Sequence, residues 1–201
     1  AGVPVSVILL TLGENGIPGH MVGTTPGDMG LKRAVEFDQG MKKIGVEPII
    51  FDFPDTKLID LPLKEITEVV LPEVRKKQPA VLIANSPEKI PIPYINHSDH
   101  RRAGEVADRV AEVANITTFY QSIPKANYRP EVDFLTRNRY VATHFIPLNR
   151  EFRNKRMEVI FERYKSQFDP QEQGRWRTIF DATTAYRGGL KHRELYMRQV
   201  R

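Results

Sequence analysis

The chain has 201 residues and no cysteine; it is long enough for one domain with a sizeable core, and disulfides, thiolate zinc sites and cysteine nucleophiles are excluded. Any zinc would have to be held by histidine and carboxylate side chains. No apolar run approaches the roughly 20 residues that cross a bilayer, and the first residues lack a signal-peptide pattern, so we expect a cytoplasmic protein with no membrane partner.

The charge of the chain is unevenly distributed around a formal net value of +5. From Arg101 onward, 20 Lys and Arg stand against 12 Asp and Glu, a charge of +8, which leaves −3 for the first half. Such asymmetry can mark a nucleic-acid surface. The basic residues lie mostly on predicted helix faces without interleaved aromatic residues, so the sequence does not favour a nucleic-acid partner.

The first predicted elements are a strand, a long loop and a helix. Residues 3–11 form a strongly apolar strand, and a Gly/Pro-rich loop containing His20 follows it through Gly30. Such a loop at the carboxyl end of a strand can form a lid or a substrate wall. Its glycines match neither the dinucleotide nor the P-loop spacing, so nucleotide binding is not expected. Residues 31–44 form an amphipathic helix that ends at Gly45, with an apolar side made of Leu31, Ala34, Val35 and Met41.

The alternation of strands and helices continues through the middle of the chain. Residues 48–53 form a strand, and a helix follows that Pro72 should kink or divide; its apolar positions are Leu63, Ile66, Val70 and Val74. Residues 80–84 are a short continuous apolar run, as expected of a strand covered on both faces, and residues 101–114 form another amphipathic helix. This order predicts the α/β class, with a mostly parallel sheet and helices on both of its faces.

Two further strands and a long helix complete the predicted elements. The strands are residues 116–120 and 140–146, and His144 in the second is interpreted as a hydrogen-bonded core or rim histidine. Residues 150–168 form a helix with an apolar stripe typical of core packing rather than of a cofactor site. The stripe consists of Met157, Ile160, Phe161, Tyr164 and Phe168.

The stretch Asn96-His97-Ser98-Asp99-His100 opens the helix of residues 101–114, after a proline-rich loop. Ser98 or Asp99 is expected to cap the first turn. His100 lies three residues before Ala103 on the predicted buried face, and His97 lies just ahead of the helix, so the two imidazoles should converge. A single histidine at a helix start is usually a surface or capping residue. The pair with an intervening Asp, downstream of the carboxyl end of a strand, favours a metal or acid/base site instead.

Several motifs together resemble the LmbE-like, or PIG-L, family of zinc-dependent N-acetylglucosaminyl deacetylases. His97-Ser98-Asp99-His100 stands in place of the family's His-Pro-Asp-His. The apolar strand ending in Leu10-Thr11-Leu12-Gly13-Glu14-Asn15-Gly16 is similar to the family's, as are Arg33 and Glu36 in the next helix. Residues 155–167 resemble the family's Lys…His-x-Ser-Gln helix, with Tyr164 at the histidine position, and Arg187-Gly188 and Glu194 follow. The resemblance covers nearly the whole chain.

The resemblance implies a Rossmann-like fold and zinc-dependent hydrolysis of the acetamido group of an N-acetylglucosamine-type sugar or sugar conjugate. In such a site His100 would be a zinc ligand, and His97 would stabilise the oxyanion or protonate the leaving amine. Asp99 would orient an imidazole from behind, as carboxylates near metal-bound histidines do. The substrate-binding residues would be Glu14, Asn15 and Arg33.

The chain departs from the family at the first motif, His-Pro-Asp-Asp, which supplies two zinc ligands and the general base. The family carries it upstream of the equivalent of Val3, and His20 does not replace it, because no Asp occupies either of the next two positions. A catalytic zinc site takes three protein ligands. We therefore expect residues 1–201 to be a single LmbE-like domain that lacks its first strand and helix. The alternatives are that another polypeptide supplies the missing piece, or that catalysis has been lost.

Three functional hypotheses follow from the sequence. The first is a zinc-dependent deacetylase acting on a small-molecule amino sugar. The second is a non-catalytic relative that keeps a sugar pocket, and the third is a basic nucleic-acid binder that keeps only the fold. The sequence names neither the exact sugar nor the oligomeric state, and assembly into a homo-oligomer stays open.

Overall fold

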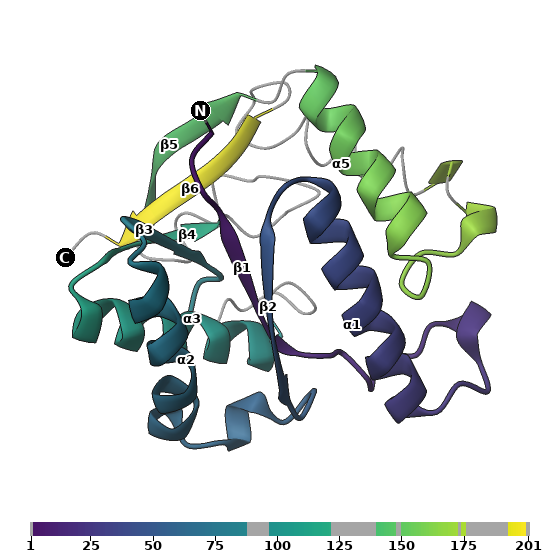
Figure 1. Cartoon of the computed structure of the whole chain (residues 1–201), viewed down its shortest axis with the longest axis horizontal. Coiled ribbons are helices and arrows are strands. Elements are labelled where there is room, and N and C mark those ends of the chain that lie inside the picture. Colours follow the sequence, from purple (N-terminus) through teal and green to yellow (C-terminus); the bar gives the residue numbers. More distant parts are fainter. Residues whose placement is uncertain are drawn as a thin grey trace. The chain divides into compact units, whose positions relative to one another are not determined.

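The computed structural model describes residues 2–87, 97–121, 140–147, 150–172, 174–175 and 193–199. The chain divides into two compact units. Figure 1 shows the helices and strands that they contain. The first unit comprises Ala1–Lys57 with Asn149–Asp181, and the second comprises Leu58–Leu148 with Ala182–Arg201. A single LmbE-like domain over residues 1–201 stays a prediction.

The first unit contains a pair of parallel strands and two long helices. Strand β1 (Ser6–Thr11) pairs with β2 (Glu47–Phe53), and Ile8 lies opposite Ile49. The short 3-10 helix η1 (Gly19–Met21) and helix α1 (Pro26–Lys43) connect the two strands, as a parallel crossover requires. Helix α5 (Arg150–Arg163) and the 3-10 helix η3 (Pro170–Glu172) complete this unit.

The second unit contains a four-stranded sheet in the order β3-β4-β6-β5. Strand β3 (Val81–Ala84) pairs in parallel with β4 (Thr117–Gln121), whereas β5 (Tyr140–Pro147) and β6 (Arg193–Gln199) add antiparallel pairs. The 3-10 helix η2 (Leu58–Asp60) precedes α2 (Leu63–Lys77), and α3 (Ser98–Ala114) connects β3 to β4. The predicted α/β class is confirmed, since parallel strands alternate with helices from β1 to β4.

Helix α1 begins five residues earlier than predicted and buries a different face. The Thr25 hydroxyl accepts a hydrogen bond from the Asp28 N–H at 3.2 Å, and Pro26 occupies the first helical position, where its missing N–H costs nothing. The buried side chains include Met29 and Phe37. Leu31 and Val35, predicted on the packed side, are 68% and 55% exposed, because the buried stripe runs one residue out of phase with them.

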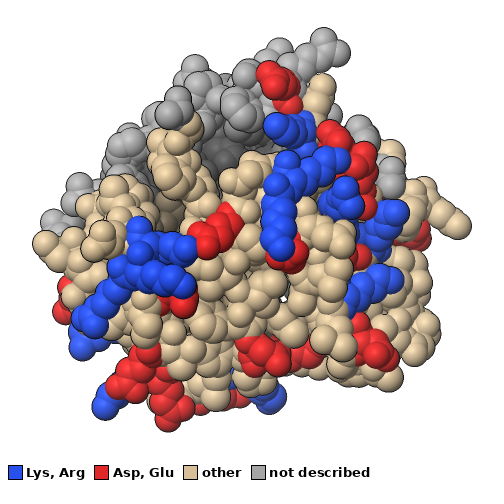
Figure 2. Space-filling view, viewed as in Figure 1, with Lys and Arg blue, Asp and Glu red and all other residues tan. Residues whose placement is uncertain are grey.

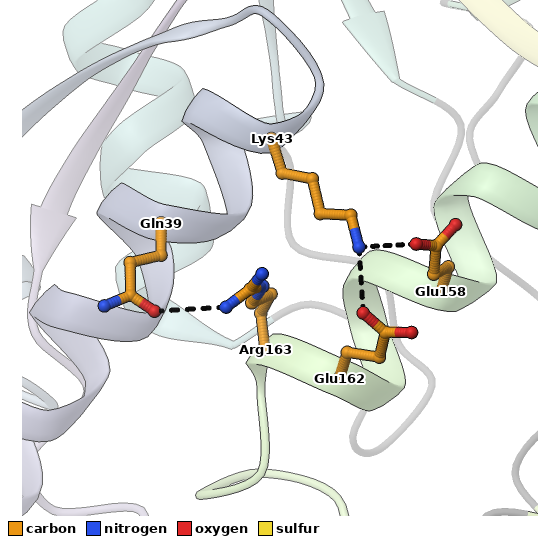
Figure 3. Close-up of polar contacts among 5 residues, drawn as sticks. All are labelled: Gln39, Lys43, Glu158, Glu162 and Arg163. Atoms are coloured by element: carbon orange, nitrogen blue, oxygen red, sulfur yellow. Dashed lines mark hydrogen bonds and ion pairs between the residues drawn. The ribbon is translucent and has the colours of Figure 1, made fainter.

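Helices α1 and α5 lie side by side in the first unit (Figures 1 and 3). The predicted helix of residues 150–168 ends at Arg163, and its Met157 and Phe161 are buried, as the apolar stripe predicted. On the exposed side, the Lys43 ammonium contacts Glu158 and lies 2.8 Å from Glu162 (Figure 3). Exposed ion pairs contribute little to the free energy of folding, so the buried apolar side chains hold the two helices together.

The second unit has its core between α2 and α3. Ile66, Val70 and Val74 of α2 are buried, as are Val106 and Val110 of α3. Burial of each such side chain contributes about 1.5–3 kcal/mol to the stability of the folded unit. Pro72 was predicted to kink or divide α2, and it does not divide it. The buried stripe on both sides of Pro72 offsets the lost backbone hydrogen bond.

The remaining predicted strands are present with shifted ends. The strand predicted at residues 3–11 begins at Ser6, and the one predicted at 116–120 is β4. Strand β3 was expected to be covered on both faces, but Val81 and Ile83, which point to one side, are exposed. A short apolar run such as residues 80–84 indicates a strand, but it does not determine how many faces of that strand are covered. His144 lies in β5, and its side chain falls outside the described part of the structure.

The charged surface consists of basic and acidic side chains that lie beside one another on the face drawn in Figure 2. Along single helices, Lys42 pairs with Asp38 at 2.8 Å and Arg109 pairs with Glu112 at 2.5 Å. Such mixed charges are typical of solvated helix faces rather than of a basic stripe that tracks phosphates. Within the described residues, no helix has the length and apolar character needed to cross a membrane.

Candidate active site

The candidate catalytic motif begins α3 and is capped by its own histidine. The helix starts at Ser98, and the His97 Nδ1 accepts a hydrogen bond from the Asp99 N–H at 3.3 Å. The prediction that Ser98 or Asp99 caps the helix was wrong, because the extended backbone at His97 (ψ 150°) lets its ring reach forward to the Asp99 N–H in the first turn. Since Nδ1 accepts, the proton of the neutral ring resides on Nε2. His97 therefore offers one donor nitrogen to a substrate.

The two imidazoles of the motif converge, as predicted. Their ring centroids are 6.0 Å apart, with an angle of 67° between the ring planes. His100 is exposed, however, and does not lie on the buried face of α3 as predicted. That face begins with Asp99, which is 6% exposed, and continues through Val106 and Val110. The motif thus holds a carboxylate inside the unit and presents the two rings outward.

Gly104, one turn after His100, fixes the distance between α3 and the segment after β3. A Cβ at Gly104 would lie 2.4 Å from the Asn85 carbonyl oxygen and 2.8 Å from the Pro87 nitrogen. Both are backbone atoms, so the helix and this segment are in direct backbone contact. The motif is thereby held at the carboxyl end of β3, where ligand sites gather in α/β folds. Sequence reasoning missed this contact, although a glycine inside an amphipathic helix is a signal of close packing.

The turn that follows β1 carries the predicted substrate-binding residues Glu14 and Asn15. Gly13 has φ +68°, and its carbonyl accepts a hydrogen bond from the Gly16 N–H at 3.1 Å. Arg33 on α1 donates from its two terminal nitrogens to the carbonyls of Gly13 and Gly16. The guanidinium therefore braces both ends of the turn, and Arg33 has a structural contact in addition to its predicted substrate role.

Asp55, at the carboxyl end of β2, holds the same turn from the other side. Its carboxylate accepts from the Asn15 N–H at 3.1 Å, and its carbonyl accepts from the Asn15 side-chain amide at 2.9 Å. Its own N–H donates to the Glu14 carboxylate at 2.8 Å. Sequence reasoning missed Asp55. The available signal was a carboxylate that follows a strand parallel and adjacent to the one preceding Glu14.

The electrostatics of this part of the first unit centre on Arg33. Burial lowers the pKa of its guanidinium, and the carboxylates of Asp55, Glu36 and Glu14 oppose that shift. An arginine stays charged under these conditions. Arg33 therefore supplies a fixed positive charge among three carboxylates, those of Glu14 after β1, Asp55 after β2 and Glu36 on α1.

Glu36 and Ser166, both marks of the resemblance, bind each other. Glu36 is 8% exposed; one of its oxygens accepts from the Ser166 N–H at 3.0 Å and the other from the Ser166 hydroxyl. Tyr164 is half-buried, and burial, together with the Glu36 carboxylate, raises the pKa of its phenol. This cluster joins α1 to the turn after α5, which suggests a structural role for both motif positions.

The described residues do not complete a zinc site. Within them, no group of three or more histidine, aspartate or glutamate side chains is arranged to hold a metal ion. The Nδ1 of His97 accepts the capping hydrogen bond from the Asp99 N–H, so this nitrogen is not available to a metal ion. A catalytic zinc needs three protein ligands, so the described residues by themselves do not fit one.

Comparison with known proteins places these motifs in a family. The chain is 30% identical over 128 residues to diacetylchitobiose deacetylase from Thermococcus kodakarensis, a match covering 61% of this chain and 43% of that protein. The chain therefore spans less than half of the length of this curated relative. Among solved structures, N,N'-diacetylchitobiose deacetylase from Pyrococcus horikoshii matches 98% of this chain and 74% of its own, with a TM-score of 0.69 and 18% identity.

A hydratase shares the same fold. The 4-carboxy-2-hydroxymuconate hydratase from Pseudomonas putida KT2440 matches 98% of this chain and 84% of its own, with a TM-score of 0.69 and 14% identity. These structural matches confirm the predicted fold and, at such low identity, the fold alone. Residues 1–111, which include the turn after β1, Arg33 and the His97–His100 motif, match the family described as GlcNAc-PI de-N-acetylase. The chain belongs to this family, PIG-L.

Proposed function

We propose that this protein is a deacetylase that hydrolyses the acetamido group of an N-acetylglucosamine-type sugar or sugar conjugate. The observation that carries the proposal is the pair of imidazoles at the start of α3, 6.0 Å apart, with the buried Asp99 between them in sequence. The family membership supports the same chemistry. Because a hydratase shares the fold, the proposal rests on these residues and not on the fold.

The reaction splits an amide with water. Attack on the carbonyl carbon forms a tetrahedral species with a negative oxygen, and collapse breaks the C–N bond to give acetate and a free amine. The leaving nitrogen must gain a proton during this collapse. A fixed donor at the developing oxyanion is worth roughly 3 kcal/mol of the barrier. We assign this donor to the Nε2–H of His97, whose other nitrogen is fixed by the helix cap.

Asp99 and His100 are assigned supporting roles. Asp99 is the buried carboxylate of the motif, and we propose that it orients an imidazole, as carboxylates behind catalytic histidines do. His100 is the proposed metal ligand. The roles assigned to His97 and Asp99 do not depend on zinc, because the described residues do not assemble a three-ligand site. Zinc dependence is therefore a separate proposal, tested by the metal content of the purified protein and of its His100→Ala variant.

The turn after β1 is the proposed contact for the sugar. Glu14 and Asn15 are polar side chains at the carboxyl end of a parallel strand, and Arg33 provides a positive charge beneath the turn. Hydrogen bonds from Arg33 and Asp55 fix the turn before any ligand arrives. A preformed polar turn lowers the ordering cost of binding a hydroxyl-rich ligand.

The direct test is release of acetate from N-acetylated sugars. Diacetylchitobiose and N-acetylglucosamine are suitable substrates, because the curated relative is a diacetylchitobiose deacetylase. We expect equal amounts of acetate and free amine, and loss of both products in His97→Ala. Binding of the sugar without acetate release, in protein supplied with zinc, would instead support a non-catalytic sugar-binding relative, which the incomplete metal site favours.

A further inference from the structure

Residues 17–24, named here the 17–24 loop, connect the Gly13–Gly16 turn to α1 and include η1. Their backbone hydrogen bonds are local: the Met21 N–H donates to Pro18 at 2.9 Å, and the Thr24 N–H donates to Met21 at 3.1 Å. Gly19 and Gly23 have open space where a side chain would be, and Gly23 has φ +95°. The loop can therefore move about these two glycines without breaking packed contacts there.

One side chain ties the loop to a distant part of the first unit. The Nε2 of His20 lies 2.8 Å from the carbonyl oxygen of Lys165. A carbonyl only accepts, so His20 is the donor and carries a proton on Nε2. Among the described residues, this is the hydrogen bond that joins the loop to a segment beyond α1.

The acceptor is itself held firmly by α1. The residue before Lys165, Tyr164, packs its ring so closely on Gly40 that a Cβ there would lie 3.1 Å from the ring. The residue after it, Ser166, is 0% exposed, and its N–H and hydroxyl both donate to Glu36. The Lys165 carbonyl is thus fixed from both sides. Among the described contacts, the His20 imidazole thus joins the 17–24 loop to a firmly held acceptor.

We propose that His20 is a positioning residue that holds the 17–24 loop in place as a wall of the sugar pocket. This inference rests on the proposed function, because the loop begins immediately after the turn that carries Glu14 and Asn15. With the bond made, the wall is formed before the sugar arrives. With the bond absent, part of the binding energy is used to order the loop, so the Michaelis constant rises and the chemical step is unchanged.

The test compares the wild-type chain with His20→Ala and His20→Gln. Glutamine keeps a side-chain N–H donor, whereas alanine removes it. Loss of this exposed hydrogen bond, worth about 1 kcal/mol, should open the loop about fivefold more often. We expect amide hydrogen exchange at Met21 and Thr24 to speed up about fivefold in His20→Ala, with exchange in α3 unchanged. His20→Gln should exchange close to the wild-type rate.

Kinetics with diacetylchitobiose give the second readout. His20→Ala should raise KM about fivefold and leave kcat near the wild-type value, and His20→Gln should restore most of KM. Equal exchange rates at Met21 and Thr24 in all three proteins would overturn the proposal, and so would faster exchange with an unchanged KM. Exchange is measured without substrate. Lack of acetate release by the wild-type protein would therefore refute the proposed function and the wall of the sugar pocket with it, while the exchange data still decide whether His20 holds the loop.

Discussion

Replacement of Gly104 by alanine should destabilise the second unit and displace the catalytic motif. The added Cβ would lie 2.4 Å from the Asn85 oxygen, 2.8 Å from the Pro87 nitrogen and 3.1 Å from the Pro87 Cα. These are backbone atoms, so no side chain can rotate away. Overpacking of this kind costs about 3 kcal/mol, and the helix gains about 1 kcal/mol from alanine, which leaves a net loss of about 2 kcal/mol.

The matched control is Gly27→Ala, which places the same substitution in the first turn of α1. Nothing lies within 4 Å of a Cβ at Gly27, so this variant should be as stable as wild type or slightly more stable. Urea unfolding followed by far-ultraviolet circular dichroism gives both free energies of unfolding. Acetate release is measured under conditions in which Gly104→Ala is still folded. It should be lower in Gly104→Ala than in Gly27→Ala, because His100 lies on α3 and His97 caps that helix. Equal stability of the two variants would refute the close contact.

Three further predictions concern the other contacts. His97→Asp keeps a helix-capping oxygen and has no N–H donor, so the free energy of unfolding should stay within about 0.5 kcal/mol of wild type while acetate release falls about 100-fold. His97→Ala loses the cap as well, and its free energy of unfolding in urea should fall by about 1 kcal/mol. Glu36→Ala leaves the buried N–H and hydroxyl of Ser166 without their acceptor, so the free energy of unfolding in urea should fall by about 2–3 kcal/mol. The control is the exposed Glu158→Ala, for which we expect only a small change in the free energy of unfolding. The hydrogen bonds of Lys43 raise its pKa and lower the pKa of Glu162. The stability that this ion pair contributes is therefore lost as pH falls below about 4.5, where Glu162 gains a proton, and as pH rises above about 10.5, where Lys43 loses one. Lys43→Met should make the free energy of unfolding less dependent on pH in both ranges, and a wild-type profile identical to that of the variant would contradict this.

The α/β class and the element order could be predicted from the sequence because each signal is local. Apolar runs marked β1, β2 and β3, and 3.6-residue periodicity marked α2 and α3. Helix α1 shows where local signals fail. Its glycines concealed the start at Thr25-Pro26, a cap signal that was present in the sequence, and its exposed Leu31 and Val35 competed with the buried Met29 and Phe37 in the periodic pattern.

The residues of the candidate site were chosen from sequence motifs, and their roles stay predictions, whereas most of their contacts could not be predicted. The His-x-Asp-His spacing at a strand-to-helix junction correctly predicted that two imidazoles converge. No local signal indicated that His97 caps the helix, since Ser and Asp are the commoner caps. The partners of Arg33 and Asp55 lie 17 to 41 residues away along the chain. Such pairings depend on how the strands align, which no local pattern encodes.

The central claim, deacetylation through the His97–His100 motif, is tested most directly by acetate release from diacetylchitobiose. The wild-type protein, supplied with zinc, is compared with His97→Ala, His100→Ala and the surface variant Lys64→Ala. We predict acetate and free amine in equal amounts from the wild type and Lys64→Ala, and neither product from the two histidine variants. Acetate release that persists in both histidine variants would contradict the account.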